Sequence, residues 1–522
     1  MPLRTQKAFT VSEAASSSLP VLWGKRDLFF TVVAAFLFVA LVWVGGSGVR
    51  GTDQYWYVAD VASLLSGAGN QTNQIFPIVL EQEDSLPRPF VHNILTVYLP
   101  VLPGIFAGAY RGWIVVNLLS SLLTAFLIYR TATHFTCPVY ARLAAFVYLW
   151  LPITFWQTTQ PLAEAAIAPG VALVVYLYAT GSTSYGRWVL MMGVAALLFY
   201  SRHTFIVLLA VLPVAYVFPL HRREPRAVWG VVGLAVLAVG FVVAEPVLFP
   251  RYHDFSYVEV FNGTAPIGLH NMWYFFTPPS NTLDLSTIFS KLGNALRVQF
   301  TMVDASGPLF FWPFNLLVLA LSVLVLRLKR RAPYPVVIAG LFFIVLHFLV
   351  IVGFQNQFRY SLLATPPLLV ALGVLLGRIQ TLQAPRAIRV APVVVMLVML
   401  PLDATLALKS RSDGVEQRRI RDTMGAVFQH HIPDSSAVMV VYEGHHMLLQ
   451  GYVLRPRPVL YVDPHYAAGQ IERLRKRLDV QWLVARLDSP LLGHVEHHLV
   501  QEIMGLSPPY DHLGVFRLSR TE

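Results

Sequence analysis

Apolar segments of about 20 residues, the length that crosses the hydrocarbon core of a bilayer, recur in this 522-residue chain from Asp27 to Leu408. The composition agrees, since 13% of the residues are charged whereas a soluble domain is about one quarter charged. We therefore expect an α-helical, polytopic membrane protein with about 11 transmembrane helices. The predicted crossings are 28–47, 111–130, 142–157, 163–180, 187–200, 203–219, 228–249, 307–327, 333–353, 360–377 and 388–406.

The segment 91–109 is also apolar, but Pro100 and Pro103 interrupt it. It is either a twelfth crossing or a re-entrant or interfacial helix. The distribution of charge favours the second reading. If 91–109 does not cross, the breaks on one side carry 17 Lys/Arg against 3 Asp/Glu, and those on the other side carry 8 against 12. Because cytoplasmic loops are rich in Lys and Arg, the N-terminal tail (1–27) is expected in the cytoplasm.

Residues 409–522 differ in composition from the rest of the chain. The β-branched runs 437–442, 457–462 and 480–486 are typical of buried strands, and 467–478 is typical of a helix. This alternation predicts a small α/β domain with a partly parallel sheet. Because 11 crossings, an odd number, separate it from the cytoplasmic N-terminal tail, it is expected on the extracytoplasmic, periplasmic side. It has no glycine-rich phosphate loop and no nucleophile elbow, so no chemistry is assigned to it. From Lys409 onward, 14 Lys/Arg stand against 13 Asp/Glu, so the net charge of +11 reflects membrane topology and indicates no nucleic acid.

Two long loops, 46–110 and 250–307, are expected on the outer side, and chemistry built from loops is expected there. The first opens with Asp53, Tyr57 and Asp60, whose spacing places both acids and the tyrosine on one face of a helix. A carboxylate close to the membrane is costly and is usually functional. The alternative role for Asp53 is to cap that helix through its carboxylate.

Glu164, in "QTTQPLAEAAIAPG", is a second candidate on the same side, with the alternative of an interfacial acid stabilised by a helix N-terminus. Arg359, in "GFQNQFRYSLLATPPLL", is placed to clamp a lipid phosphate or to reach the headgroups. Arg202 and Arg251 are expected at the same level.

These segments resemble the GT-C glycosyltransferases, which take sugars from polyprenyl-phosphate carriers, and in particular the protein O-mannosyltransferases and the lipid A aminoarabinose transferases. The similar stretches are "TDQYWYVADVASLLSG", "PRPFVHNILTVYLP", "QTTQPLAEAA" and "QFRYSLLATPPLLVALG". The similarity spans residues 28–406. One departure is Gln54, because those two branches usually carry a second acid directly after the first.

The resemblance implies inverting transfer of a sugar from a polyprenyl-phosphate donor to an acceptor hydroxyl at the outer face of the cytoplasmic membrane. Asp53 would be the catalytic base, and Glu164, with Asp60 and Tyr57, would orient the acceptor or a metal. Arg359, with Arg202 and Arg251, would bind the donor phosphate. A divalent cation, Mg²⁺ or Mn²⁺, is compatible with this set but is not required by it. The acceptor would be a glycan, a lipid or a protein.

Two other functions fit the same topology. A transporter or flippase for lipid-linked saccharides usually has paired repeats with broken helices and charges near the midplane, whereas the charges here cluster at the outer mouth. An O-antigen polymerase or ligase would use Arg and His in a large outer loop, and "RYHDFSYVEVFNG" keeps that alternative open.

Overall fold

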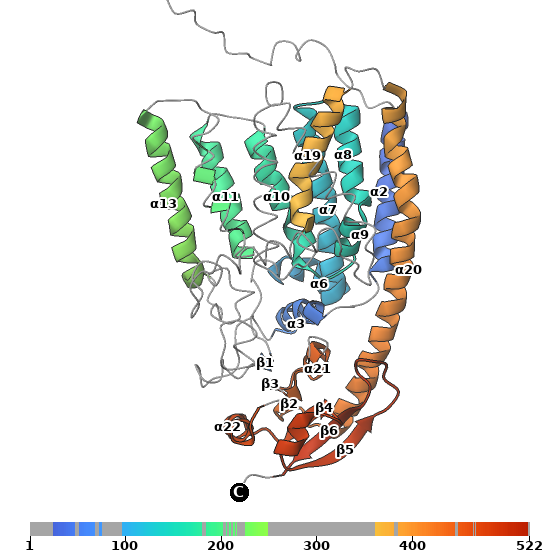
Figure 1. The fold of residues 1–522 in the computed structure, drawn as a ribbon, viewed down its shortest axis with the longest axis vertical. Coiled ribbons are helices and arrows are strands. Elements are labelled where there is room, and N and C mark those ends of the chain that lie inside the picture. The colour runs from blue at the N-terminus through green and yellow to red at the C-terminus, as the bar shows by residue number, and fades with distance from the viewer. Residues whose placement is uncertain are drawn as a thin grey trace, which may run out of the picture.

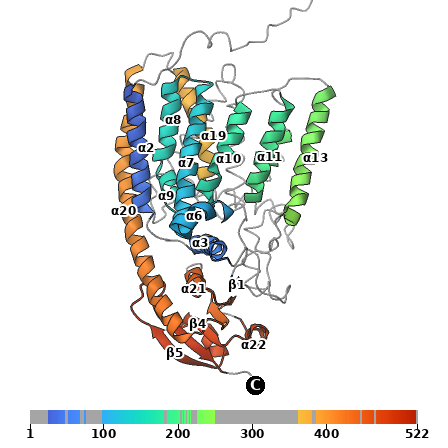
Figure 2. The same cartoon turned by 180° about the vertical axis from the view of Figure 1, so that it is seen from behind.

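A computed structural model describes residues 25–46, 52–67, 73–75, 97–179, 184–201, 225–248, 361–379, 385–443, 447–462 and 466–519, with a few single positions between them. Long helices stand side by side at one end of the molecule, and a small sheet domain lies at the other (Figure 1). The view from behind shows the same two parts, with α3 between them (Figure 2).

Most helices of the bundle begin and end within a few residues of the predicted crossings, whereas α20 continues 25 residues beyond the end of its predicted crossing and α8 and α9 share one. They are α2 (Lys25–Gly45), α7 (Ala109–Thr133), α8 (Pro138–Trp150), α9 (Pro152–Thr158), α10 (Ala163–Ala179), α11 (Tyr185–Ser201), α13 (Pro225–Leu248), α19 (Ser361–Ile379) and α20 (Pro385–His431). The predicted crossings 307–327 and 333–353, and most of 203–219, lie outside the described residues.

Of the helices in the described ranges, α7 is long and apolar enough to cross a membrane, with a mean hydropathy of 1.8. The pair α8 and α9 also qualifies if it is counted as one span bent by 54°. Several other helices of the bundle are apolar but contribute shorter apolar stretches, such as Phe29–Gly45 and Tyr185–Ser201. The number of crossings therefore stays a prediction.

The predicted continuous crossing 142–157 is wrong in one respect, because the helix breaks inside it. Leu151, between α8 and α9, has an extended backbone with φ −68° and ψ 127°, and Pro152 is the first residue of α9. Proline disfavours the helical conformation in the residue before it and itself starts helices well. The axis of α9 is therefore bent by 54° from that of α8.

The segment 91–109 does not form one long helix in its described part. A seven-residue helix, α6 (Val101–Ala107), ends at Gly108, whose φ is +82°, a conformation that favours glycine. Seven residues rise only about 10 Å, so α6 by itself cannot cross a bilayer. It packs closely on α7, where a side chain on Gly112 would collide with the backbone of Pro100 and Gly104.

Helix α20 is 47 residues long and joins the bundle to the sheet domain without a break. Its first half packs along α2, and Ser410 donates a hydrogen bond to the carbonyl oxygen of Gly45 at 2.5 Å. The predicted domain boundary at residue 409 therefore falls within a continuous helix. The two parts of the molecule are linked by a rigid element.

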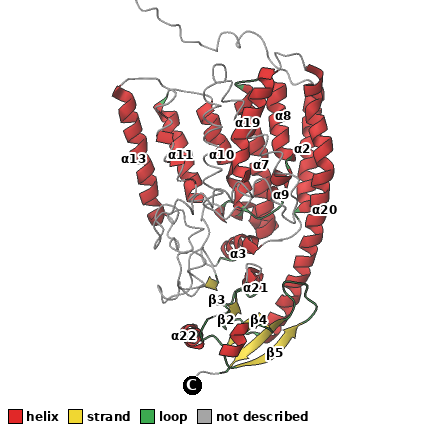
Figure 3. Cartoon of the chain, viewed as in Figure 1, coloured by secondary structure: helices red, strands yellow, loops and turns green. Residues whose placement is uncertain are grey.

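The sheet domain contains the predicted strands and helix. Its six strands lie in the order β1-β3-β2-β4-β6-β5, coloured yellow in Figure 3. The elements are β1 (Gln74–Ile75), β2 (Val438–Val441), α21 (Leu448–Val453), β3 (Val459–Val462), α22 (Ala468–Leu478), β4 (Trp482–Arg486), β5 (His497–Ile503) and β6 (Leu513–Leu518). The first four strands in this order pair in parallel, and β4, β6 and β5 pair in antiparallel fashion.

Both faces of the parallel strands are covered, which explains their continuous apolar sequences. Val438 and Val440 of β2 point to one face, where they pack with α20 residues including Phe428. Met439 and Val441 point to the other face, where Ile471 of α22 packs. The C-terminal half of α20 thus forms part of the core of the sheet domain.

Strand β1 comes from the first long loop, not from the C-terminal region. It pairs with β3 through Gln74 opposite Val459 and Ile75 opposite Leu460. Asn73 reinforces the pairing, since its side-chain nitrogen donates to the carbonyl oxygens of Gly451 and Arg457 at 3.1 and 2.9 Å. Residues 73–75 of the first loop are therefore attached to the sheet domain.

Candidate functional site

Helix α3 (Thr52–Leu65) carries the first group of predicted site residues and lies between the bundle and the sheet domain (Figure 3). Asp53 is in its first turn, where a carboxylate is favoured by the exposed backbone N–H groups. The side chain of Asp53 lies outside the described part of the structure. The predicted helix is confirmed, and the role of Asp53 stays a prediction.

Tyr57 joins α3 to the bundle. Its ring packs edge-on against Trp113 of α7 with the centroids 5.3 Å apart, and Trp113 Nε1 donates to the carbonyl oxygen of Tyr57 at 3.2 Å. Tyr57 and Trp113 share one buried cluster with Ala163 and Ala166. Those alanines lie in the first turn of α10, next to Glu164. The structure therefore brings the Tyr57 face of α3 close to the helix turn that carries Glu164.

Glu164 is fully buried in the first turn of α10, where the positive end of the helix dipole stabilises a carboxylate. Directly before Glu164 in the sequence, the loop after α9 forms a buried polar layer together with α7 and α9. Asn117 Nδ2 donates to the carbonyl oxygens of Gln160 and Gln157 at 2.5 and 3.4 Å, and Ser121 shares a hydrogen bond with Thr158 at 2.8 Å.

Three side-chain amides of this layer have donors or acceptors that make no hydrogen bond with the described residues. Within the described ranges, Asn117 Oδ1 and both terminal atoms of Gln157 and of Gln160 have no hydrogen-bond partner, although all three residues are 0% exposed. A buried polar group without a partner costs about 1–3 kcal/mol, so such groups in a native structure call for an explanation. The layer offers donors and acceptors to a hydroxyl-bearing ligand or to ordered water.

Asn117, Gln157 and Gln160 were not among the residues predicted for the site. Gln160 lies between two predicted crossings. Asn117 lies inside the predicted crossing 111–130 and Gln157 at the end of 142–157, so a search for polar residues in predicted crossings finds these two. Asp403 belongs to the same class. It lies in α20, is fully buried, and neither of its carboxylate oxygens has a partner in the described part of the chain.

Asp60, on the same face of α3 as Tyr57, is 2% exposed and interacts with Arg455 of the sheet domain. Arg455 Nη1 donates to the carbonyl oxygen of Ala59 at 2.7 Å. Burial, only partly offset by Tyr452 and Asp60, lowers the pKa of Arg455. Nothing in the sequence around Arg455 indicates this contact, because its partner is 396 residues away.

A second contact holds α3 from the same side. The Tyr55 hydroxyl donates to Gln417 Oε1 of α20 at 2.8 Å, and burial raises the pKa of this tyrosine. Helix α3 is thus fixed by the bundle through Trp113 and by the sheet domain through Gln417 and Arg455. A helix held from both sides can present its first turn in a defined position.

Arg359, Arg202 and Arg251 lie outside the described residues. The helix ends nearest to these arginines in the sequence are described. Gly373 of α19 packs on the start of α8, and Gly233 of α13 faces Tyr185 at the start of α11. These contacts place the opposite ends of the three helices, at Ser201, Leu248 and Ser361, at the α3 end of the bundle (Figure 1).

The described residues contain no group of three or more His, Cys, Asp or Glu side chains arranged to hold a metal ion. Because the side chain of Asp53 and the second long loop are outside those residues, the expectation of a divalent cation stays untested.

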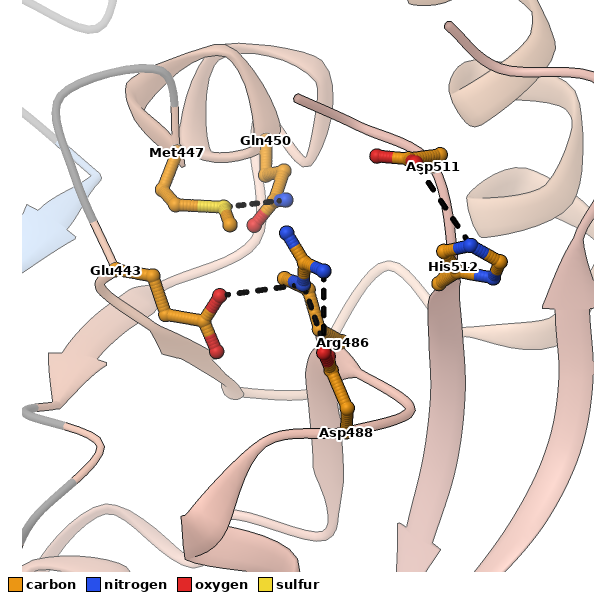
Figure 4. Close-up of polar contacts among 7 residues, drawn as sticks. All are labelled: Glu443, Met447, Gln450, Arg486, Asp488, Asp511 and His512. Carbon is orange, nitrogen blue, oxygen red and sulfur yellow. Dashed lines mark hydrogen bonds and ion pairs between the residues drawn. The ribbon is translucent and has the colours of Figure 1, made fainter. Parts of the chain in front are cut away.

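The sheet domain has a charged cluster at the carboxyl ends of β2 and β4 (Figure 4). Arg486 contacts Asp488 through Nε and Nη2 at 2.9 and 3.1 Å, and Glu443 lies 3.6 Å from its Nε. The hydrogen bond from Arg486 lowers the pKa of Asp488, whereas burial raises the pKa of Glu443. The charges compensate one another in an ion-pair network, so no further role is assigned to this cluster.

No protein-family model and no curated protein sequence matches the chain. Solved structures do match it in fold. ArnT from Cupriavidus metallidurans in the apo state aligns with a TM-score of 0.57 at 14% identity, over 94% of this chain and 97% of that one. The same enzyme bound to undecaprenyl phosphate gives 0.56 at 13% identity with the same coverage.

The oligosaccharyltransferase of Archaeoglobus fulgidus in the apo form gives a TM-score of 0.51 at 14% identity, over 88% of this chain and 69% of that one. All of these proteins are GT-C glycosyltransferases. The chain therefore has the GT-C fold over most of its length, as the resemblance in residues 28–406 predicted. At these identities the match concerns the fold alone.

Proposed function

We propose that this protein is a membrane glycosyltransferase that moves a sugar from a polyprenyl-phosphate carrier to an acceptor hydroxyl at the outer face of the cytoplasmic membrane. The observation that carries the proposal is the position of α3. It sets Asp53 in a helix turn at the end of the bundle, and it packs Tyr57 against the turn that carries Glu164. The GT-C fold supports the same assignment, since one matching structure holds undecaprenyl phosphate.

In the proposed reaction Asp53 is the general base. Its carboxylate removes the proton of the acceptor hydroxyl while that oxygen attacks the anomeric carbon of the donor sugar. The bond between the anomeric carbon and the phosphate oxygen breaks, and polyprenyl phosphate leaves with the electron pair. Attack from the face opposite the leaving group inverts the configuration.

The leaving phosphate gains negative charge, which a preorganised cation stabilises in the transition state. Arg359, Arg202 and Arg251 have this role in the proposal. They stand one to three positions in sequence from Ser361, Ser201 and Leu248, the helix ends on the α3 side. Glu164, Tyr57 and Asp60 orient the acceptor. A divalent cation would add Lewis-acid assistance at the phosphate, with Glu164 and Asp60 as the candidate oxygen ligands.

The direct test is to incubate the purified full-length protein in nanodiscs with a panel of radiolabelled polyprenyl-phosphate sugars and to measure which donor is consumed. The proposal expects at least one donor to lose its sugar to an added acceptor, or slowly to water. A transporter would move the lipid across the bilayer without cleaving the bond between sugar and phosphate, so flipping without cleavage would replace the proposal with that alternative. The segment 251–263, which would support a polymerase or ligase, lies outside the described residues.

A further inference from the structure

A groove of about 690 Å³ runs between α3, the C-terminal half of α20, and the end of α21 with the segment that follows it. Its α3 wall is formed by Ala62 and Ser66, at the end of the helix opposite Asp53. Its volume lies within the range of about 300–1,000 Å³ that is typical of small-molecule sites. Among the residues that the structure describes, Tyr57, Asp60 and Glu164 do not line it.

Small residues keep the groove open. Gly425 and Ala426 lie in the middle of the α20 wall, and Ala62 and Ser66 line the groove from α3. A Cβ placed on Gly425 would meet only Val453, at 3.6 Å, which is an ordinary contact. Larger side chains in these walls would occupy the space without a clash against the backbone.

Polar groups and one aromatic ring stand around these small residues. Arg421 and Asp422 lie toward one end of the α20 wall and Gln429 toward the other, while Tyr452 and Arg455 come from the opposite side. Guanidinium, carboxylate and amide groups are planar and can form paired hydrogen bonds. Neighbouring hydroxyls of a sugar offer such pairs, and the C–H face of a sugar ring packs on an aromatic ring. Tyr452 is held in place by Tyr55, with the ring centroids 5.8 Å apart.

The charges of the groove are balanced. Arg421 donates from Nε and Nη2 to Oδ1 of Asp422 at 2.9 and 2.7 Å, and Arg455 interacts with Asp60. A polyanion such as a phosphorylated lipid would gain little here, because each guanidinium already has a carboxylate nearby. The balance favours an uncharged ligand rich in hydroxyls.

The groove also lies at a useful distance from the proposed reaction. Ala62 follows Asp53 by nine residues in α3, which is about 14 Å along the helix axis and about half a turn around it, so a ligand that reaches from the groove to Asp53 passes around the helix. We propose that the groove binds the body of a neutral, linear oligosaccharide acceptor whose terminal hydroxyl extends to Asp53. Binding of a remote part of a substrate positions the reacting end. The role as acceptor rests on the proposed transferase function, whereas the binding of a neutral glycan does not.

The test uses the full-length protein in nanodiscs, without any donor, and measures glycan binding by saturation-transfer NMR and titration. The probes are three neutral hexasaccharides, maltohexaose, mannohexaose and α-1,5-arabinohexaose, with hexagalacturonate as the anionic comparison. Ala426→Trp fills the groove from an exposed position of α20. Val415→Trp is the matched control, because Val415 is 51% exposed on the same helix and does not line the groove.

We expect at least one neutral hexasaccharide to bind the wild type and Val415→Trp equally, and to bind Ala426→Trp at least about tenfold more weakly, a difference of about 1.4 kcal/mol. Gln429→Trp, at a second exposed position, should show the same loss of binding. It keeps the test valid if Ala426→Trp does not fold. The inference is overturned if no neutral probe binds, if hexagalacturonate alone binds, or if both groove variants bind as the wild type does. Because no donor is present, a protein with no transferase activity would still reveal glycan binding, so the two proposals fail separately.

Discussion

Arg455 of the sheet domain donates a hydrogen bond to the backbone carbonyl of Ala59 in α3, with 2.7 Å between Nη1 and the oxygen. The two residues are 396 positions apart. The contact fixes the helix that carries Asp53 from the side opposite the bundle, and it places a guanidinium beside Asp60. The sheet domain thus contacts α3 directly, and we expect it to contribute to the site by positioning that helix.

Arg455→Met keeps the apolar stem of the side chain but removes this hydrogen bond and leaves Asp60 without the nearby positive charge. Hydrogen bonds to charged groups contribute about 1.5–3 kcal/mol. We expect a lower melting temperature and slower transfer, measured by thermal unfolding and by the donor-consumption assay. Arg473→Met, at an exposed position of α22, is the control and should change neither. An Arg455→Met protein with wild-type stability and rate would show that the contact does not position α3.

Asn73→Ala removes both donors from the carbonyls of Gly451 and Arg457. Two lost hydrogen bonds at about 1 kcal/mol each should release β1 from the edge of the sheet. Hydrogen exchange at Gln74 and Ile75 should become faster, while exchange in β4 should stay slow. Asn73→Asp should be at least as damaging, since its carboxylate would face two carbonyl oxygens. A stable β1 in both variants would mean that strand pairing alone holds the first loop.

Much of this fold follows from local signals in the sequence. Apolar length predicts α7 and α10 within three residues at each end, and β-branched runs predict β2, β3 and β4. The break at Leu151 was missed, although Pro152 marks it locally. In contrast, β1 is two residues long, and its pairing with β3 depends on a partner almost 400 residues away. The contact of Arg455 with Ala59 cannot be predicted from local sequence for the same reason. Nonlocal contacts of this kind leave no periodic pattern.

The buried amides of the polar layer give a prediction in which stability and activity separate. Gln157→Met and Gln160→Met replace amides that have no partner among the described residues by apolar side chains of similar size. Such replacements are nearly neutral or stabilising. We expect an equal or higher melting temperature together with slower transfer, because the amides are retained for a polar ligand. A fall in melting temperature with an unchanged transfer rate would make the layer purely structural.

The topology is tested independently of the chemistry. A reporter fused after Arg331 should read cytoplasmic, and one fused after Glu522 should read extracytoplasmic, because Lys and Arg accumulate on the inner side. Paired alkaline phosphatase and green fluorescent protein fusions measure both positions. If Arg331 reads extracytoplasmic and Glu522 reads cytoplasmic, the assignment of 91–109 as a segment that does not cross is wrong. If both positions report the same side, one of the three predicted crossings between them is wrong.

Asp53→Asn tests the central claim most directly. Asparagine keeps the shape of the side chain and caps a helix about as well as aspartate, but it cannot act as the base. The measurement is the rate of sugar transfer from the preferred polyprenyl-phosphate donor by the purified protein, with donor binding and melting temperature measured on the same sample. Removal of a general base typically costs about 10²–10⁴ in rate. We predict a loss of at least the lower value with binding and stability unchanged, whereas a near-normal rate would contradict the account and leave Asp53 as a helix cap.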